Sequence, residues 1–299
     1  MTHPNPSTAL ARVLVDELAA RGVELVVISP GSRSAALAIA ATEHPELATR
    51  VFIDERSAAF HALGAARASR RPVAVVSTSG TAAANFLPAV VEADMSCVPL
   101  VVVSADRPVE LRGVGANQTI DQVGLFGTKV RAFVDIAAPD HANDVNAAWR
   151  GQVGDSMAAA TGSTPGPVHL NVAFREPTVP VTDDGRTAAT PYQFPTPRVS
   201  RETGPAPADR PLPLPHLEPG KGLIIAGDGD YRRGALADRA AELGWPVLAT
   251  AMSGMRGGRV ITTYHHLFAD VVPPQLEPET VVAVGAIGPS TRLEDLVAA

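Results

Sequence analysis

Apolar and polar residues follow one another along the first half of the chain in a pattern that predicts alternating strands and helices. Between residues 9 and 21 the apolar residues recur at helical spacing, and Gly22 ends that segment before a β-branched run begins. The same order returns three more times. The expected strands are residues 23–28, 51–53, 72–77 and 99–103, and the expected helices are residues 9–21, 35–41, 57–69 and 82–93. This repetition is typical of an α/β fold in which helices cover both faces of a parallel sheet.

Polar loops follow the C-terminal ends of these predicted strands. Because parallel strands end on the same edge of a sheet, their loops lie together, and ligands of open α/β sheets bind at that edge. The polar residues that we expect there are Ser32, Arg33, Glu55, Ser79, Thr81, Asp106 and Arg107. Four polar loops on one edge predict a binding site.

Asp54 and Glu55 stand where the second strand, residues 51–53, passes into its helix, and two interpretations fit this acidic pair. Acidic residues favour a helix N-terminus, so both could cap the helix. Alternatively, Glu55 faces a ligand at the sheet edge. A lone acidic pair favours the cap, whereas the neighbouring polar loops favour the ligand.

Composition narrows the possible functions. The net charge of -6 argues against a general nucleic-acid-binding protein. The single cysteine excludes an internal disulfide and fits a reducing compartment. No signal peptide is visible, and no apolar run approaches the ~18 residues needed to span a bilayer. We therefore expect a cytoplasmic protein without a membrane span.

Two domains and a linker are expected. Residues 1–176 form the first α/β domain. After the fourth strand we expect a polar turn at residues 115–122 that enters a short helix, and then a strand at 130–136, a helix at about 140–160 and a strand at 167–172. Eleven prolines among residues 177–219 predict an extended linker over 177–220. A second, partial α/β domain occupies residues 221–299 and ends in a helix without a cap, so we expect a truncated chain.

Two other features are interpreted as structural. His169 has no metal-ligand partner nearby in the sequence, so we predict a core or edge histidine. The Gly227-Asp228-Gly229 turn follows a strand, but Arg232 occupies the place of the third glycine of a dinucleotide-binding motif. The turn could also open a metal–diphosphate motif, which requires an Asn further along the chain. No Asn occurs after Asn171, so this motif is incomplete as well.

Five motifs together resemble a known family, the thiamine diphosphate-dependent 2-succinyl-5-enolpyruvyl-6-hydroxy-3-cyclohexene-1-carboxylate synthases of menaquinone biosynthesis. The resemblance is specific over roughly the first 180 residues and weak beyond them. The motifs are Ile28-Ser29-Pro30-Gly31-Ser32-Arg33-Ser34, Ile53-Asp54-Glu55-Arg56-Ser57-Ala58, Thr78-Ser79-Gly80-Thr81-Ala82, Ser104-Ala105-Asp106-Arg107-Pro108 and Gly115-Ala116-Asn117-Gln118-Thr119.

The resemblance implies a cofactor and a reaction. Thiamine diphosphate would bind at Glu55, Pro30 and Ser79, with Glu55 as the glutamate that bonds N1′ of the aminopyrimidine. Enzymes of this family decarboxylate 2-oxoglutarate and add the resulting carbanion to isochorismate. The family also implies a homodimer or homotetramer, because the cofactor lies between two subunits.

The resemblance further assigns substrate-binding roles to Ser32, Arg33, Arg107, Asn117, Gln118 and Arg292, with Gln118 also acting on the reacting intermediate. Arginine suits both substrates, since each carries carboxylates. In this family a third domain holds the diphosphate and Mg²⁺ or Mn²⁺. We expect that domain to be absent here, so no metal ligand is assigned and the chain represents the N-terminal portion.

Two alternatives remain open from the sequence. Glu55 is shared by other thiamine enzymes, so the chain could belong to an acetolactate synthase-like protein or another 2-oxo-acid enzyme. The paired arginines Arg33 and Arg107 argue against a monocarboxylate substrate. A truncated fragment that only binds a partner or a dicarboxylate is the second alternative.

Overall fold

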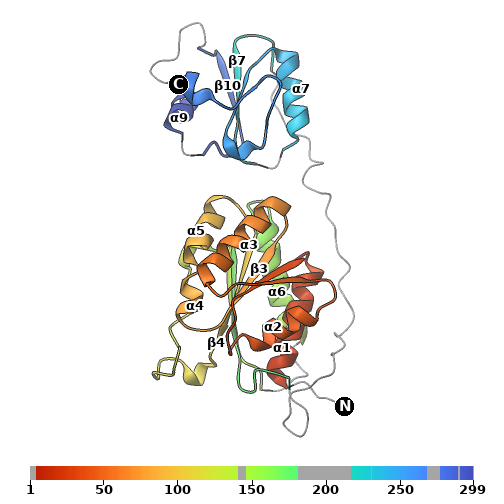
Figure 1. Cartoon of the computed structure of the whole chain (residues 1–299), viewed down its shortest axis with the longest axis vertical. Coiled ribbons are helices and arrows are strands. Elements are labelled where there is room, and N and C mark those ends of the chain that lie inside the picture. Colours follow the sequence, from red (N-terminus) through yellow and green to blue (C-terminus); the bar gives the residue numbers. More distant parts are fainter. Residues whose placement is uncertain are drawn as a thin grey trace. The chain divides into compact units, whose positions relative to one another are not determined.

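The computed structural model describes residues 5–140, 146–180, 217–229, 231–267, 277–288 and 290–298. The chain divides into two compact units, Met1–Arg201 and Glu202–Ala299. Each unit is an α/β structure, as the sequence predicts, and is described by itself (Figure 1).

The described part of the first unit contains a six-stranded sheet in the order β2-β1-β3-β4-β6-β5, and every neighbouring pair is parallel. The strands are β1 (Leu25–Ile28), β2 (Ala48–Val51), β3 (Val73–Ser77), β4 (Leu100–Asp106), β5 (Ala132–Ile136) and β6 (Val168–Ala173). β3, β4 and β6 are buried along their whole length, as expected for strands with helices on both faces.

Helices cover both faces of this sheet and bury two apolar cores (Figure 1). One core joins the sheet to α1 (Pro6–Ala20), α2 (Ala35–Glu43) and α6 (Asn146–Thr161). The other joins it to α3 (Glu55–Ser69) and α5 (Leu87–Met95). The alternation of side chains along each strand supplies one set of residues to each core.

A topological switch point lies between β1 and β3. The chain leaves β1 towards α2 on one face, and leaves β3 towards α5 on the other face. The two loops touch, since a Cβ at Gly31 would stand 2.2 Å from Cβ of Thr78. Glycine is therefore required at position 31. Ligands of open parallel sheets bind at such a point.

The prediction of a buried strand at residues 51–53 is wrong. β2 ends at Val51, and the side chains of Val51 and Ile53 are 64% and 91% exposed. β2 is an edge strand, so only one neighbour covers it. Apolar character alone does not distinguish a buried strand from an edge strand beside an exposed apolar turn.

Three other element boundaries differ from the prediction. The helix expected at 82–93 is broken into α4 (Thr81–Ala84) and α5, because Pro88 fits only in the first turn of a new helix. β4 continues through Asp106, so residues 104–106 belong to a strand. The segment after Gly115 contains turns where a short helix was expected.

Other predictions for the first unit hold. His169 is fully buried and bonds to Ser104, as expected of a core histidine. Burial lowers its pKa to about 4. Helix α6 carries Trp149 as expected, although residues 141–145 of the predicted helix lie outside the described residues. Most of the predicted linker, residues 181–216, lies outside them too.

The described part of the second unit has a four-stranded parallel sheet in the order β10-β7-β8-β9. Its elements are β7 (Gly222–Ala226), α7 (Arg233–Leu243), β8 (Val247–Ala249), β9 (Val260–Ile261), α8 (Tyr264–Leu267), β10 (Thr280–Val284) and α9 (Thr291–Ala298). A Cβ at Gly227 would stand 2.1 Å from the carbonyl oxygen of Ala286. The Gly227–Gly229 turn is therefore used in backbone packing, as predicted.

None of the helices in the described ranges is long and apolar enough to cross a membrane.

Candidate active site

Three of the candidate residues meet at the carboxyl edge of the first sheet. The Ser79 hydroxyl donates to the carbonyl oxygen of Gln118 at 3.0 Å. The Arg107 guanidinium donates to the Ser79 hydroxyl and, at 3.1 Å, to the same Gln118 carbonyl. Nε2 of Gln118 donates back to the Ser79 carbonyl at 3.2 Å. The loops after β3 and β4 and the segment that follows Gly115 are thus bonded to one another.

Gln118 has an unusual backbone conformation. Its φ is 54°, in the left-handed region that non-glycine residues rarely occupy. The contacts with Ser79 and Arg107 hold it there, and its side chain is exposed at the sheet edge. Such strain at a polar, accessible residue is common at functional sites.

Two arginines concentrate positive charge beside this cluster. Burial lowers the pKa of Arg107, and the positive charge of Arg33 lowers it further. Arg33 itself donates to the Phe174 carbonyl at 2.9 Å and pairs at 3.2 Å with Glu176, whose side chain is 65% exposed. A bound carboxylate would relieve the repulsion between the guanidinium groups. The charge distribution therefore favours an anionic ligand.

The acidic pair at the start of α3 divides into two roles. Asp54 is the N-cap, and its carboxylate accepts the Ser57 amide at 2.7 Å. This hydrogen bond lowers the pKa of Asp54. The half-buried Glu55 is the first helical residue, and within the described part of the chain its carboxylate makes no hydrogen bond or ion pair. The capping interpretation is thus confirmed for Asp54 alone.

The remaining candidates are less closely connected. Pro30, Ser32 and Asn117 are exposed in loops at the same edge. Within the described ranges, Ser32 and Asn117 form hydrogen bonds through their backbone carbonyls and not through their side chains. Asp106 belongs to the interior, because it is fully buried and bonded to Asn171 and Arg112. Arg292 is the second residue of α9 in the second unit, so its place relative to these residues stays a prediction.

Sequence reasoning missed the side chains beneath the loops. Gln122 and Asn171 are almost fully buried and bond to each other at 2.9 Å. One signal was present: His169 and Asn171 alternate with apolar residues in strand 167–172, which places two polar side chains on one face of a buried strand. Nothing in the local sequence pointed to Gln122 as the partner of Asn171.

The residues fit the pyrimidine half of thiamine diphosphate. Glu55 offers a carboxylate with no partner in the described chain, which a heterocyclic nitrogen could use. The hydroxyls of Ser29 and Ser77, at the ends of β1 and β3, are buried and likewise without a hydrogen bond among the described residues. For a divalent metal, the described residues offer no group of three or more His, Cys, Asp or Glu side chains that could hold the ion.

Comparison with known proteins agrees with this assignment. Residues 8–125 match the N-terminal TPP binding domain of thiamine pyrophosphate enzymes. Curated relatives named 2-succinyl-5-enolpyruvyl-6-hydroxy-3-cyclohexene-1-carboxylate synthase match 97% of the chain at 49% identity in Thermobifida fusca and 100% at 41% in Halobacterium salinarum. A third, from Geobacillus thermodenitrificans, matches 93% at 43% identity. The chain spans about half the length of these relatives, 52%, 55% and 49% respectively.

Residues 8–125 of the first unit are thus similar to the N-terminal TPP binding domain of thiamine pyrophosphate enzymes. The particular resemblance, to the 2-succinyl-5-enolpyruvyl-6-hydroxy-3-cyclohexene-1-carboxylate synthases, is confirmed. It extends through the second unit as well, where the motifs alone gave only a weak match.

Proposed function

We propose that this chain belongs to a thiamine diphosphate-dependent transferase that decarboxylates 2-oxoglutarate and joins the remaining four-carbon unit to isochorismate, a step of menaquinone biosynthesis. The proposal rests on the similarity to the synthases together with one structural observation. Asp54 caps α3, which leaves the Glu55 carboxylate available to a ligand.

Glu55 would hold a proton in a hydrogen bond with N1′ of the aminopyrimidine. Its place at the sheet edge, in the first turn of α3, supports this role. Pro30 and Ser79, from the loops that flank the switch point, would line the ring. When bound, thiamine diphosphate supplies the stabilised carbanion chemistry that decarboxylation and carbon–carbon bond formation require.

Arg33 and Arg107 would bind substrate carboxylates, since their mutual repulsion is relieved by an anion. Ser32, Asn117 and Gln118 would orient the substrate through hydrogen bonds, and Arg292 would add a positive charge from the second unit. Gln118 is the best placed of these, because Ser79 and Arg107 hold its backbone while its side chain stays exposed.

Mg²⁺ or Mn²⁺ would be held together with the diphosphate by other parts of the full-length protein. The greater length of the relatives supports this proposal. A homodimer or homotetramer would complete the site, and the exposed apolar side chains of Ile53 and Phe60 near Glu55 support such an association. Light scattering on the full-length protein tests the assembly. We place the protein in the cytoplasm.

Glu55→Gln in the full-length protein tests the function. Glutamine is nearly isosteric but cannot exchange a proton with N1′, so we expect kcat to fall by about 10²–10⁴-fold with an unchanged melting temperature. The matched control is Asp54→Asn, at the position immediately before Glu55. An amide at an N-cap still accepts the Ser57 amide, so both turnover and stability should stay close to wild type.

Steady-state rates with 2-oxoglutarate and isochorismate, and thermal unfolding, are measured on both variants. Normal turnover of the Glu55→Gln protein would remove Glu55 from the mechanism. A wild-type protein that turns over pyruvate faster than 2-oxoglutarate would assign the chain to a different thiamine enzyme.

A further inference from the structure

Beneath the candidate site lies a set of buried polar side chains that the proposed function does not use. Ser104, Asp106, Asn171 and Gln122 are each at most 1% exposed. Polar groups in such surroundings destabilise the fold unless they are hydrogen-bonded. We call Gln122, Asn171, Ser104 and Asp106 the relay.

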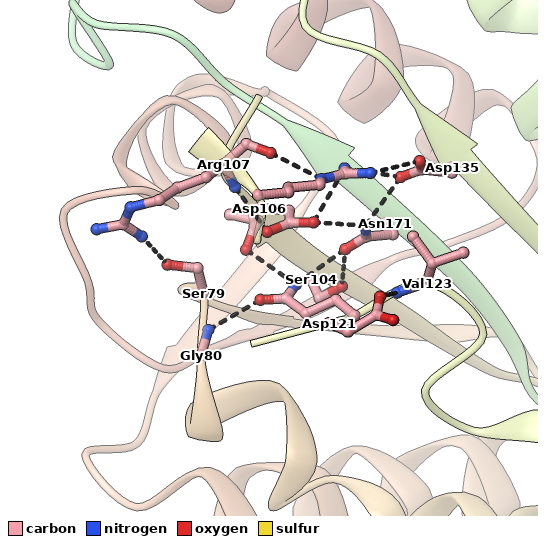
Figure 2. Close-up of polar contacts among 12 residues, drawn as sticks. Ser79, Gly80, Ser104, Asp106, Arg107, Asp121, Val123, Asp135 and Asn171 are labelled. Carbon is pink, nitrogen blue, oxygen red and sulfur yellow. Dashed lines mark hydrogen bonds and ion pairs between the residues drawn. The ribbon is translucent and has the colours of Figure 1, made fainter. Parts of the chain in front are cut away.

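Asn171, on β6, is the junction of the relay (Figure 2). Its Oδ1 accepts from the Ser104 hydroxyl at 2.8 Å and from Nε2 of Gln122 at 2.9 Å. Its Nδ2 donates to carboxylate oxygens of Asp106 and Asp135, both at 2.9 Å. The amide therefore uses all four of its hydrogen-bonding positions. No other orientation of this side chain would satisfy the same four groups.

Gln122 connects this junction to the loop after β3. Its Oε1 accepts the backbone amide of Gly80 at 2.8 Å. Its Nε2 donates to Asn171 and, at 3.3 Å, to the carbonyl of Ala105 on β4. One side chain thus ties the interior of the sheet to the residue that follows Ser79.

Gly80 leaves little freedom at this contact. Its φ of 85° suits glycine, and a Cβ there would stand 3.0 Å from the carbonyl oxygen of Gln118. The same Gln118 carbonyl accepts from Ser79 and Arg107. A shift of the Gly80 amide would therefore displace the backbone that holds Gln118 in its left-handed conformation.

Asp106 connects the relay to the loop after β4, which begins with Arg107. One carboxylate oxygen accepts from Asn171, and the other accepts the backbone amide of Arg107 at 2.7 Å. Arg112 pairs with the same carboxylate at 2.9 Å and with Asp135. The backbones of Gly80 and Arg107, which belong to different loops, are consequently fixed to one amide in the interior.

We propose that Gln122 and Asn171 are positioning residues that hold the loops of Ser79, Arg107 and Gln118 in register with one another. They touch no substrate in this proposal and act only through those loops. The inference rests on the proposed function for its effect on turnover. Its effect on loop order stands independently of that function.

The test compares Gln122→Met with Val153→Ala in the full-length protein. Methionine fills a similar volume but neither donates to Asn171 nor accepts from Gly80. Val153 is fully buried on α6, on the opposite face of the sheet, so its truncation lowers the melting temperature without touching the relay. Gln122→Glu is the conservative variant, because a neutral glutamic acid keeps one acceptor and one donor.

Amide hydrogen exchange of residues 78–84 and 115–125 is the first measurement. We expect Gln122→Met to exchange at least about tenfold faster than wild type in both segments, with Gln122→Glu in between and Val153→Ala unchanged there. Equal exchange in Gln122→Met and Val153→Ala would overturn the proposal. If the methionine variant fails to fold, the comparison of Gln122→Glu with wild type decides it in the same way.

Steady-state kinetics is the second measurement. Misplaced binding groups reduce turnover strongly, so Gln122→Met should lose about tenfold or more in kcat/KM for 2-oxoglutarate, while Val153→Ala stays within about twofold. Loss of the same size in both would overturn a positioning role. A wild-type protein that does not convert 2-oxoglutarate with isochorismate would contradict the proposed function, and the exchange data alone would then decide the role of the relay.

Discussion

Two buried polar clusters occupy opposite faces of the same sheet, and they are built differently. The relay lies on the face of α3 and α5 and consists mainly of neutral amide and hydroxyl groups around Asp106. The other, here the ionic cluster, joins α1, α2 and α6. Its members are Arg12, Asp16, Glu17, Arg21, Glu43, His44 and Arg150.

The ionic cluster connects helices to helices. Arg150 pairs with Asp16 at 2.6 Å and with Glu17 at 2.9 Å, and both carboxylates are at most 2% exposed. The two ion pairs of Arg150 join α6 to α1 and involve no residue of the loops at the carboxyl edge. The relay, in contrast, ends on the backbone amides of Gly80 and Arg107. Burial and polarity alone therefore do not identify a functional cluster. The segments to which the cluster is hydrogen-bonded do.

Removal of a charge from the ionic cluster should produce the largest change in stability. Arg150→Met removes the charge that Asp16 and Glu17 share, so that Asp16 keeps only His44 and Glu17 only Arg21 as an ion-pair partner among the described residues. Because both carboxylates are buried, we expect a loss of about 3–5 kcal/mol in the free energy of unfolding. Urea titration measures it. The fraction that remains folded should keep its kcat/KM, and a parallel loss of both would contradict the separation of the two faces.

Substitution of a residue in the candidate active site should reduce activity strongly and stability little, the reverse of what we expect for Arg150→Met. Arg107→Lys keeps the positive charge but loses the planar group that reaches Ser79 and the Gln118 carbonyl. We expect kcat/KM for 2-oxoglutarate to fall by about 10–100-fold, with less than about 1 kcal/mol lost in stability. Steady-state kinetics and urea titration on one preparation check both values. A stability loss as large as that of Arg150→Met would make Arg107 a structural residue.

Acidification should show a smaller effect of the ionic cluster. Burial would raise the pKa of Asp16, but His44 and Arg150 outweigh it and hold the pKa below its ordinary value of 3.8. Asp16 therefore contributes stability that is fully present above about pH 4 and is lost as the pH falls through its folded-state pKa. Asp16→Asn should flatten the decrease of unfolding free energy between about pH 4 and pH 2, whereas an equally steep decrease would contradict this.

The sequence by itself determined the order of strands and helices, the parallel sheet and the edge at which the polar loops meet. These features follow from hydrophobic periodicity and from residues such as Gly22, and both are local. It also contains the motifs around Glu55, Ser79, Arg107 and Gln118, because residue types and their spacing can be read without knowledge of the fold. The similarity to thiamine enzymes could be inferred from these alone.

Only the tertiary structure decided three other matters. It showed that β2 is an edge strand, which exposes Val51 and Ile53. It separated the capping role of Asp54 from Glu55, two adjacent residues of the same charge. It also joined Gln122 to Asn171 across 49 positions of sequence. Burial and hydrogen-bond partners depend on which distant segments pack together, and no local pattern of residues contains that information.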